Sequence, residues 1–248
     1  MSPDIKFTER DAKILSFLHT QGVATLSQLE REFFRTHDYC KKRLSILGRF
    51  GLIDSVRFSK GISQVPSRMI ELRQKIEQEG KDWRKVKLYR INAHLLGNSK
   101  FQSPLSEPIF WQHQIGLGEI RHYLSKVLGH GVFLSDPQSK KEWARFRMGG
   151  EVPIPDLVWR GSDTEFAIEF ERTNKGEYRY YDRMARYQRS GYHRILYVAK
   201  NQTIADFLTR CGTRFPKVGI TLIADLRTVF VGLPGFESIQ TFLEIPKS

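Results

Sequence analysis

Three acidic residues in the second half of the chain have the types and spacing of a metal site. Asp156 stands at the start of one apolar stretch, and Glu169 and Glu171 stand at the end of the next. Glu169 and Glu171 are two apart, so on a strand they share a face, and Asp156 can lie across from them. Three converging carboxylates repel one another unless a cation lies between them, and such oxygen ligands suit Mg²⁺ or Mn²⁺. The spacing therefore predicts an ion that activates water and stabilises phosphoryl charge; the alternative is a solvated strand face.

Basic residues and tyrosines follow directly after these acids. If this segment is one helix, its cations recur at steps of three and four and form a single stripe, which predicts contact with a phosphate backbone. Tyr180 and Tyr187 fall at the margin of the stripe, whereas Tyr181 is expected opposite it, near Met184 and the core. A tyrosine beside cations can attack phosphate or stack on bases, and Tyr180 is the first candidate nucleophile, with Tyr181 the second. The cations are Arg172, Lys175, Arg179, Arg183 and Arg186.

Alternating strands and helices surround these residues. Turn residues at 161–163 predict a hairpin, in which Phe166, Ile168 and Phe170 mark one strand face as buried. The pattern predicts an α/β domain with a central mixed sheet over residues 109–248. Its other expected elements are helices at 111–128 and 203–210, a basic helix after residue 171, and strands around 132–134, 194–199 and 219–223.

The first 58 residues predict three helices followed by a strand. Thr8 can cap the first helix and Gly22 can end it, because these residue types favour helix starts and ends. Thr25 or Ser27 can start the second helix, and Asp38 the third. The last seven of these residues alternate as in a strand.

A second alternating strand is expected at 86–91. This order of elements is that of a winged helix-turn-helix, which we expect over residues 1–103, with an insertion of unassigned role at 59–85 in the wing. Pro104 and Pro108 bracket the linker to the second domain.

The third helix carries the cations that a DNA-recognition helix needs, because long basic side chains reach phosphates and arginine can also read guanine edges. A solvated basic face on an ordinary helical domain is the alternative. The predicted DNA-contacting residues are Arg35, Lys41, Lys42, Arg43 and Arg49.

The composition of the chain favours some classes of function and excludes others. The 248 residues carry a formal net charge of +13, which favours a polyanionic partner, with nucleic acid first. The chain has no apolar run that could span a membrane, its first residues lack a signal-peptide pattern, and its two cysteines form no disulfide framework, so we expect a cytoplasmic protein. Phosphate-binding glycine motifs are absent from the sequence, so no nucleotide is expected.

The acidic hairpin resembles the PD-(D/E)xK restriction-endonuclease-like fold. Pro155-Asp156 and Glu169-Phe170-Glu171 match its motif, with Glu171 in the place of the usual lysine. The resemblance implies that Lys175 or Arg179 supplies the missing cation. It also implies that Glu119, on the first helix of the domain, is a further metal-site acid.

Together, the winged helix, the nuclease-like domain and the tyrosine-bearing basic helix are similar to the MobC-type plasmid relaxases over nearly the whole chain. Arg179-Tyr180 matches a basic residue followed by tyrosine, where that family usually has Lys-Tyr. The resemblance implies a metal-dependent nick in one strand at a plasmid origin of transfer, with accessory relaxosome and coupling proteins as partners.

Two other functions stay open. A restriction or repair endonuclease would cut both strands. A replication initiator or transcriptional regulator with a degenerate nuclease domain would bind DNA without cutting it.

Overall fold

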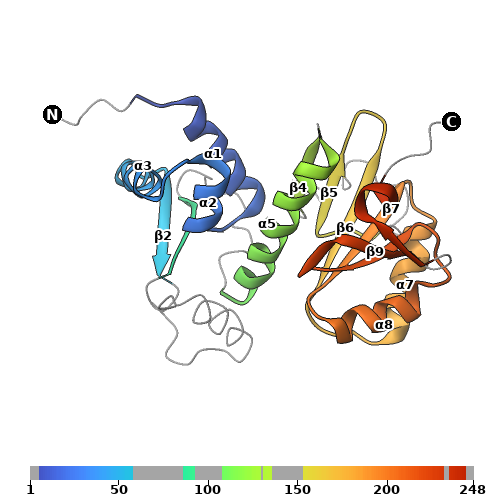
Figure 1. The fold of residues 1–248 in the computed structure, drawn as a ribbon. Coiled ribbons are helices and arrows are strands. Elements are labelled where there is room, and N and C mark those ends of the chain that lie inside the picture. The colour runs from blue at the N-terminus through green and yellow to red at the C-terminus, as the bar shows by residue number, and fades with distance from the viewer. Residues whose placement is uncertain are drawn as a thin grey trace. The chain divides into compact units, whose positions relative to one another are not determined.

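Figure 1 shows the chain as a computed structural model, coloured from the N-terminus to the C-terminus. The structure describes residues 6–57, 86–92, 108–129, 131–135, 153–231 and 235–243. Over these residues the protein is mixed α and β, with seven helices, a three-stranded sheet and a mixed seven-stranded sheet. The chain divides into two compact units, residues 1–118 and 119–248. The division falls inside one helix, whereas the sequence placed it at the 104–108 linker.

The N-terminal unit contains three short helices and the three-stranded sheet. The strands follow the order β1-β3-β2, and both pairs are antiparallel. The two-residue strand β1 was not predicted. The 59–85 insertion and residues 104–107 of the linker lie outside the described residues. The elements are α1 (Glu9–Gln21), β1 (Ala24–Thr25), α2 (Leu26–Phe33), α3 (His37–Arg49), β2 (Ile53–Arg57), β3 (Lys87–Ile91) and the beginning of α5 (Pro108–Leu128).

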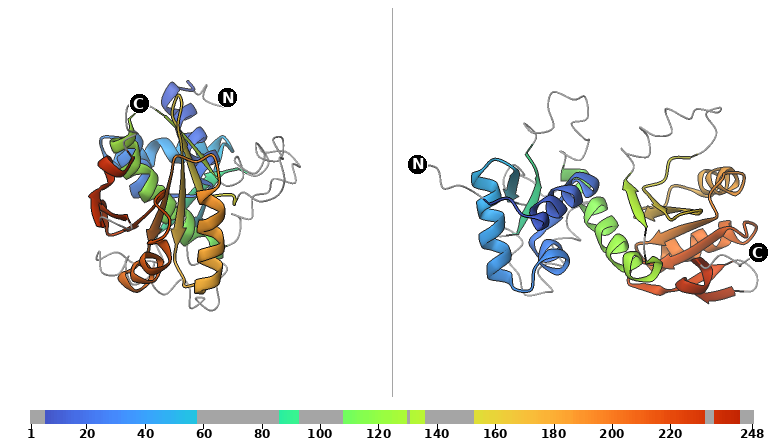
Figure 2. Two further views of the ribbon diagram at one scale, coloured as in Figure 1. Left: turned by 90° about the vertical axis from the view of Figure 1, so that its right-hand side faces the viewer. Right: turned by 90° about the horizontal axis from the view of Figure 1, so that it is seen from above.

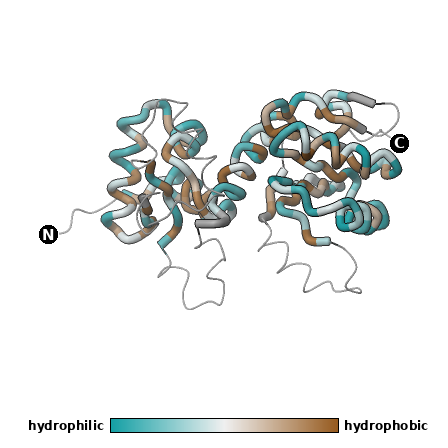
Figure 3. Tube along the Cα trace, turned by 90° about the horizontal axis from the view of Figure 1, so that it is seen from below, coloured by the Kyte–Doolittle hydropathy of each residue, from teal (hydrophilic) through white to brown (hydrophobic). Residues whose placement is uncertain are grey.

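The predicted helix ends in this unit are confirmed. Thr8 and Asp11 form a capping box at the start of α1, and Gly22 ends the helix with a positive φ of 84°. Thr25 and Gln28 form a second capping box on α2. The third helix begins at His37, one residue before the predicted Asp38. Hydrophobic and hydrophilic residues alternate along these helices (Figure 3), and their apolar sides form the core.

The C-terminal unit is built on the seven-stranded sheet, which Figure 2 shows from two further sides. The strands follow the order β10-β9-β8-β7-β6-β5-β4, in which β6, β7 and β8 run parallel and the other pairs are antiparallel. The expected mixed sheet is therefore confirmed. Its elements are β4 (Val132–Ser135), β5 (Leu157–Arg160), β6 (Glu165–Glu171), α7 (Glu177–Gln188), β7 (Arg194–Ala199), α8 (Gln202–Gly212), β8 (Val218–Leu222), β9 (Asp225–Val231), β10 (Gly235–Ser238) and α9 (Ile239–Leu243).

The predicted hairpin is confirmed as the β5–β6 pair. Gly161 N–H donates to the carbonyl oxygen of Thr164 and closes the turn, and Leu157 pairs with Ile168 at the other end. Both faces of β6 are covered. Helices α7 and α8 pack against the face that carries Ala167.

The prediction that the basic residues after the acidic strand form a single stripe on one helix is wrong. Gly176 has a positive φ of 89°, and α7 begins only after it, so Arg172 and Lys175 precede the helix. The core-facing residues of α7 are Tyr180, Met184 and Tyr187, whereas Tyr181, expected in the core, is 43% exposed.

Candidate functional site

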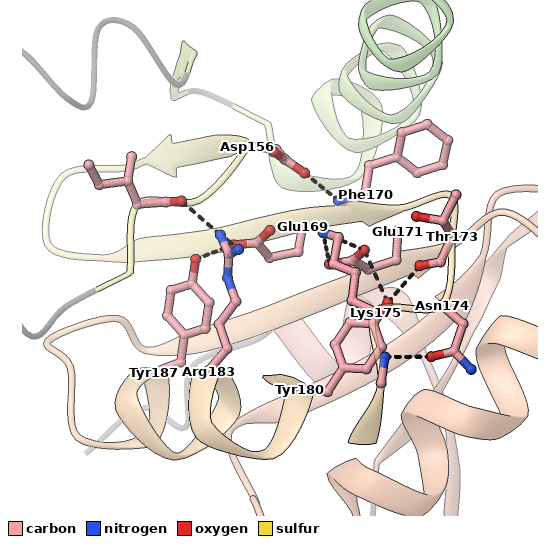
Figure 4. Close-up of polar contacts among 12 residues, drawn as sticks. Asp156, Glu169, Phe170, Glu171, Thr173, Asn174, Lys175, Tyr180, Arg183 and Tyr187 are labelled. Atoms are coloured by element: carbon pink, nitrogen blue, oxygen red, sulfur yellow. Dashed lines mark hydrogen bonds and ion pairs between the residues drawn. The ribbon is translucent and has the colours of Figure 1, made fainter. Parts of the chain in front are cut away.

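Glu169 and Glu171 lie on one face of β6, as predicted, and both side chains are buried at 1% exposure. Figure 4 shows them pointing toward side chains of α7 and of the loop before it. This burial excludes the alternative of a solvated strand face. A carboxylate is seldom buried without a partner, so the contacts of each define the site.

The Glu169 carboxylate is held by two residues of α7. Arg183 Nη2 donates to Glu169 Oε1 at 2.6 Å, and the Tyr187 hydroxyl donates to the same oxygen. Arg183 Nη2 also donates to the carbonyl oxygen of Ile154 at 3.0 Å. The guanidinium thus joins β6 to the segment that leads into Asp156.

The Glu171 carboxylate has a second pair of partners. Lys175 Nζ lies 2.7 Å from Glu171 Oε2 and 2.9 Å from Oε1. The Tyr180 hydroxyl lies 3.2 Å from Oε2 and 2.8 Å from the carbonyl oxygen of Thr173, and it can donate to both. Each acid of the Glu-x-Glu pair therefore has one cation and one tyrosine.

Asp156 lies beside these acids at the end of the β5–β6 ladder. The last paired residues are Leu157 and Ile168, and beyond them Asp156 Oδ2 accepts a hydrogen bond of 2.8 Å from the Phe170 N–H. The carboxylate therefore takes the place of a backbone acceptor where β5 has ended. If the ladder continued, Asp156 would stand opposite Glu169.

Burial and neighbouring charges shift the pKa values of Glu169 and Tyr180. Burial raises the pKa of Glu169 to about 8, and the negative charge of Asp156 adds to the rise, while Arg183 and Tyr187 oppose it. Burial also raises the pKa of Tyr180, and Glu171 adds to that shift. The surroundings of Tyr180 thus keep its hydroxyl protonated, the reverse of the activation expected from nearby cations.

The residues do not fit a divalent ion in the arrangement described. Glu169 and Glu171 each face a side-chain cation, and Asp156 faces a backbone N–H. Within the described ranges, no three His, Cys, Asp or Glu side chains are grouped so that they could hold a metal, and Glu119 on α5 joins no such group. The Mg²⁺ or Mn²⁺ centre therefore stays a prediction.

The basic residues on and before α7 that were predicted to bind DNA do not share one exposed surface. Arg183 turns inward to Glu169, Arg186 forms an ion pair of 2.5 Å with Asp182, and Arg179 is exposed. Arg172 is half-buried just after β6. The helix therefore offers a less concentrated basic surface than the sequence indicated.

Arg43, one of the predicted DNA contacts, makes its contacts within the N-terminal unit. Its guanidinium forms an ion pair with Asp11 on α1, which is 0% exposed, and Arg43 Nη2 donates to the carbonyl oxygen of Lys6 at 3.0 Å. This arginine fastens α3 to α1. The other predicted contacts are exposed, namely Arg35, Lys41, Lys42 and Arg49.

A groove of about 960 Å³ lies between α3 and the small sheet of the N-terminal unit. Lys41 and Arg49 of α3 and Lys87 of β3 line it, and Asp54 is the single acid among the described residues of its lining. Ser27, Ser45 and Ser55 also line it. Sequence reasoning missed Lys87, because the role of a strand lysine depends on the helix beside it.

The sequence placed Tyr187 at the margin of the basic stripe and not at Glu169, and it gave no role to Tyr197 on β7. Tyr197 pairs in register with Glu169 and is 0% exposed. The spacing of Tyr180, Met184 and Tyr187 at steps of four and three could have indicated an inward aromatic face.

Comparison of the chain with protein-family models, with curated proteins and with solved structures finds no match. None of the helices in the described part of the chain is long and apolar enough to cross a membrane. The function therefore has to be argued from the site itself.

Proposed function

We propose that the protein is a metal-dependent DNA nickase that cuts one strand at a specific site, and that this site lies in a plasmid origin of transfer. The observation that carries the proposal is the burial of Glu169 and Glu171 on one face of β6, with Asp156 at the adjoining strand end. In this proposal the C-terminal unit is a PD-(D/E)xK-like nuclease domain.

Burial of these acids supports a function because it does little for folding. Replacing a buried ion pair by apolar side chains is often neutral or stabilising. The site buries two such pairs side by side, and Asp156 adds a further negative charge that raises the pKa of Glu169. Groups with strongly shifted pKa values cluster at functional sites.

The N-terminal unit is proposed to be a winged helix that binds the DNA. Its supporting features are the order of its helices and strands and the groove in which Lys41, Arg49 and Lys87 outnumber Asp54. Cations in a groove attract the phosphate backbone, and the whole-chain charge of +13 acts in the same direction. Accessory relaxosome and coupling proteins remain the proposed partners.

The nuclease residues have distinct proposed tasks. Mg²⁺ or Mn²⁺ would supply Lewis-acid stabilisation of phosphoryl charge, with Asp156 and Glu169 as the residues to hold it. Lys175 places positive charge beside Glu171, and it and the exposed Arg179 are the residues proposed to bind a phosphate. Tyr180 holds Glu171 and keeps its proton, so water is the proposed attacking group in place of Tyr180.

Nicking of supercoiled plasmid tests the proposal. The plasmid carries the DNA that flanks the gene for this protein, and full-length protein is added with Mg²⁺, with Mn²⁺ or with EDTA. We expect open circles with a metal only, no circles from Glu169→Gln, and full activity from Glu165→Gln. Glu165 is a matched control because it lies on the same strand and pairs with Arg160 at the surface.

A non-catalytic DNA-binding protein is the second candidate. The observation in its favour is that Lys175 and Arg183 already neutralise the two glutamates. Retarded plasmid without nicks under every metal condition would support this candidate and contradict the nickase. Linear product would indicate a nuclease that cuts both strands.

A further inference from the structure

Two tyrosines are exposed on the outer side of α7, away from the buried acids. Tyr178 is 85% exposed and Tyr181 is 43% exposed, whereas Tyr180 between them is buried. The two exposed residues are three positions apart, so they are neighbours on the helix surface. We call this pair the tyrosine face. At its exposure, the ring of Tyr178 is open to a ligand.

The ring of Tyr181 is held by the core beneath it. It packs edge-on against Phe215, with the ring centroids 5.2 Å apart, and Phe215 is buried. Phe215 follows α8, which lies beside α7 (Figure 1). A side chain that is already held in place loses little conformational entropy when a ligand stacks on it. The tyrosine face is therefore prepared to bind a flat ring.

Two arginines from α8 and the residue after its end flank the tyrosine face. Arg214 is exposed and directly precedes Phe215 in the chain. The Arg210 guanidinium lies 5.4 Å from the centroid of the Phe207 ring. Within the described part of the chain, neither arginine forms an ion pair with an acid. Both therefore keep their positive charge available for an anion.

The buried thiol of Cys211 shows that Arg210 lies near the start of α7. Burial and the negative charge of Glu177 raise the pKa of Cys211, and the positive charge of Arg210 lowers it. Glu177 directly precedes Tyr178 and is the charge that opposes the arginines. Basic residues outnumber acidic ones both in 177–189 and in 202–217, so the surroundings favour an anionic ligand.

Open rings beside arginines match the chemistry of single-stranded DNA. Its phosphates bind cations, and each of its bases has a face that can stack on an aromatic ring. In a duplex the bases stack on one another and present only their edges in the grooves. A second copy of this chain is a poorer partner, because it carries the same net charge of +13 and would be repelled.

We propose that the tyrosine face binds single-stranded DNA, with Tyr178 and Tyr181 stacking on bases and with Arg210 and Arg214 binding phosphates. The inference uses none of the buried acids and needs no metal, so it does not rest on the proposed cleavage. It gives the C-terminal unit a DNA contact of its own.

The test is binding of a fluorescently labelled oligothymidylate to the full chain, measured by anisotropy in EDTA. We expect Tyr178→Ala and Tyr181→Ala each to weaken binding about tenfold, because stacking of one base on an aromatic ring contributes about 1–3 kcal/mol. Tyr178→Phe keeps the ring and should keep the affinity. Val132→Ala is the control, because it also shortens an exposed side chain of the C-terminal unit.

The arginines are tested by the dependence of the same affinity on salt. Arg210→Gln and Arg214→Gln should each lower the salt slope by about 0.7, the value for one phosphate contact on a single strand. The same variants should bind a duplex of the same length as the unmodified protein does. An equal loss for the single strand and the duplex would overturn the assignment to single-stranded DNA.

A covalent readout in the unmodified protein does not depend on how a variant folds. Single strands that carry 5-iodouracil are irradiated in the complex, and the cross-linked residue is identified by mass spectrometry. We expect cross-links at Tyr178 or Tyr181, because this base reacts with the aromatic ring on which it stacks. Cross-links confined to the N-terminal unit would overturn the proposal.

Three further results would contradict the inference. They are the absence of single-strand binding by the unmodified protein, unchanged binding by the double variant Tyr178→Ala, Tyr181→Ala, and a dimer that this double variant dissociates. Single-strand binding through the tyrosine face without plasmid nicking would support the inference while contradicting the nickase. Nicking without single-strand binding would do the reverse.

Discussion

Each unit has, among its described residues, a buried carboxylate paired with an arginine, and the two pairs differ in kind. Asp11 and Glu169 are both almost fully buried, their arginine partners Arg43 and Arg183 are partly exposed, and each arginine also donates to a backbone carbonyl oxygen. Yet the pKa of Asp11 is lowered to about 2, whereas the pKa of Glu169 is raised to about 8.

Neighbouring groups account for this difference. Burial works to raise the pKa of both acids. At Asp11 it is outweighed by Arg43 and by Thr8, whose backbone N–H and hydroxyl each donate at 2.7 Å. Glu169 has Asp156 beside it, and this charge adds to the effect of burial. The first pair is organised for stability, whereas the second holds a carboxyl group whose charged form is disfavoured by burial and by Asp156.

The largest expected effect is a loss of DNA cleavage when an acid beside the Glu169–Arg183 pair is replaced. Asp156→Asn keeps an acceptor for the Phe170 N–H, so the fold should persist, but it removes a proposed metal ligand. We expect plasmid nicking to fall about 1,000-fold, in the range for loss of a group that acts in the reaction. Asp163→Asn, in the hairpin turn, is the control. Nicking by Asp156→Asn at the unmodified rate would remove Asp156 from the site.

The next effect is on stability at the first pair. Arg43→Met leaves the buried Asp11 without its cation, and breaking such a pair costs about 3 kcal/mol. We expect to measure this loss of stability as faster hydrogen exchange of the backbone amides of α1 and α3. Lys42→Met, at the exposed neighbouring position, should change stability by less than about 0.5 kcal/mol. Equal effects of the two variants would show that Arg43 does not fasten the helices.

Acid should weaken the first pair in a defined pH range. The folded state holds Asp11 ionised down to a pKa of about 2, below its ordinary value of 3.8. The stabilisation is therefore complete above pH 4 and is lost as the pH falls through 2, for a total of about 2 kcal/mol. Hydrogen exchange at pH 4 and pH 2.5 measures it. In Asp11→Asn this part of the pH dependence should vanish; its persistence there would assign it to another group.

A smaller effect is expected at the groove of the N-terminal unit. Lys41→Ala and Arg49→Ala should each weaken duplex binding about fivefold and lower the salt dependence by about one phosphate contact. Lys13→Ala, which removes an exposed partner of Glu9 on α1, should have no effect. Fluorescence anisotropy at several salt concentrations separates the variants. Unchanged salt slopes in both groove variants would place the DNA elsewhere.

Local signals explain what could be predicted from the sequence. Thr8 and Gly22 mark the ends of α1 through capping and positive φ, which depend only on nearby residues. The face shared by Glu169 and Glu171 follows from the geometry of a strand. These parts of the fold and of the site were predicted correctly.

Long-range contacts explain what was missed. Arg43 turns inward because Asp11 lies 32 positions earlier in the chain, a separation that no helical pattern reveals. The orientation of α7 follows from the packing of Tyr180, Met184 and Tyr187 against the core, which places Tyr180 inside and leaves Tyr181 exposed, the reverse of what the sequence indicated. The C-terminal elements β9, β10 and α9 were not predicted either.

The central claim is that the Asp11 pair serves the fold while the Glu169 pair serves a reaction. Urea unfolding of Asp11→Asn and Glu169→Gln, each followed by hydrogen exchange in its own unit, tests it most directly. We expect Asp11→Asn to lose about 2 kcal/mol. We expect Glu169→Gln to lose less than about 1 kcal/mol, because burial already disfavours the charged form of Glu169 and the amide oxygen can still accept from Arg183 and Tyr187. A loss in Glu169→Gln as large as that in Asp11→Asn would show that the buried acids of β6 are a structural network, and would contradict the account.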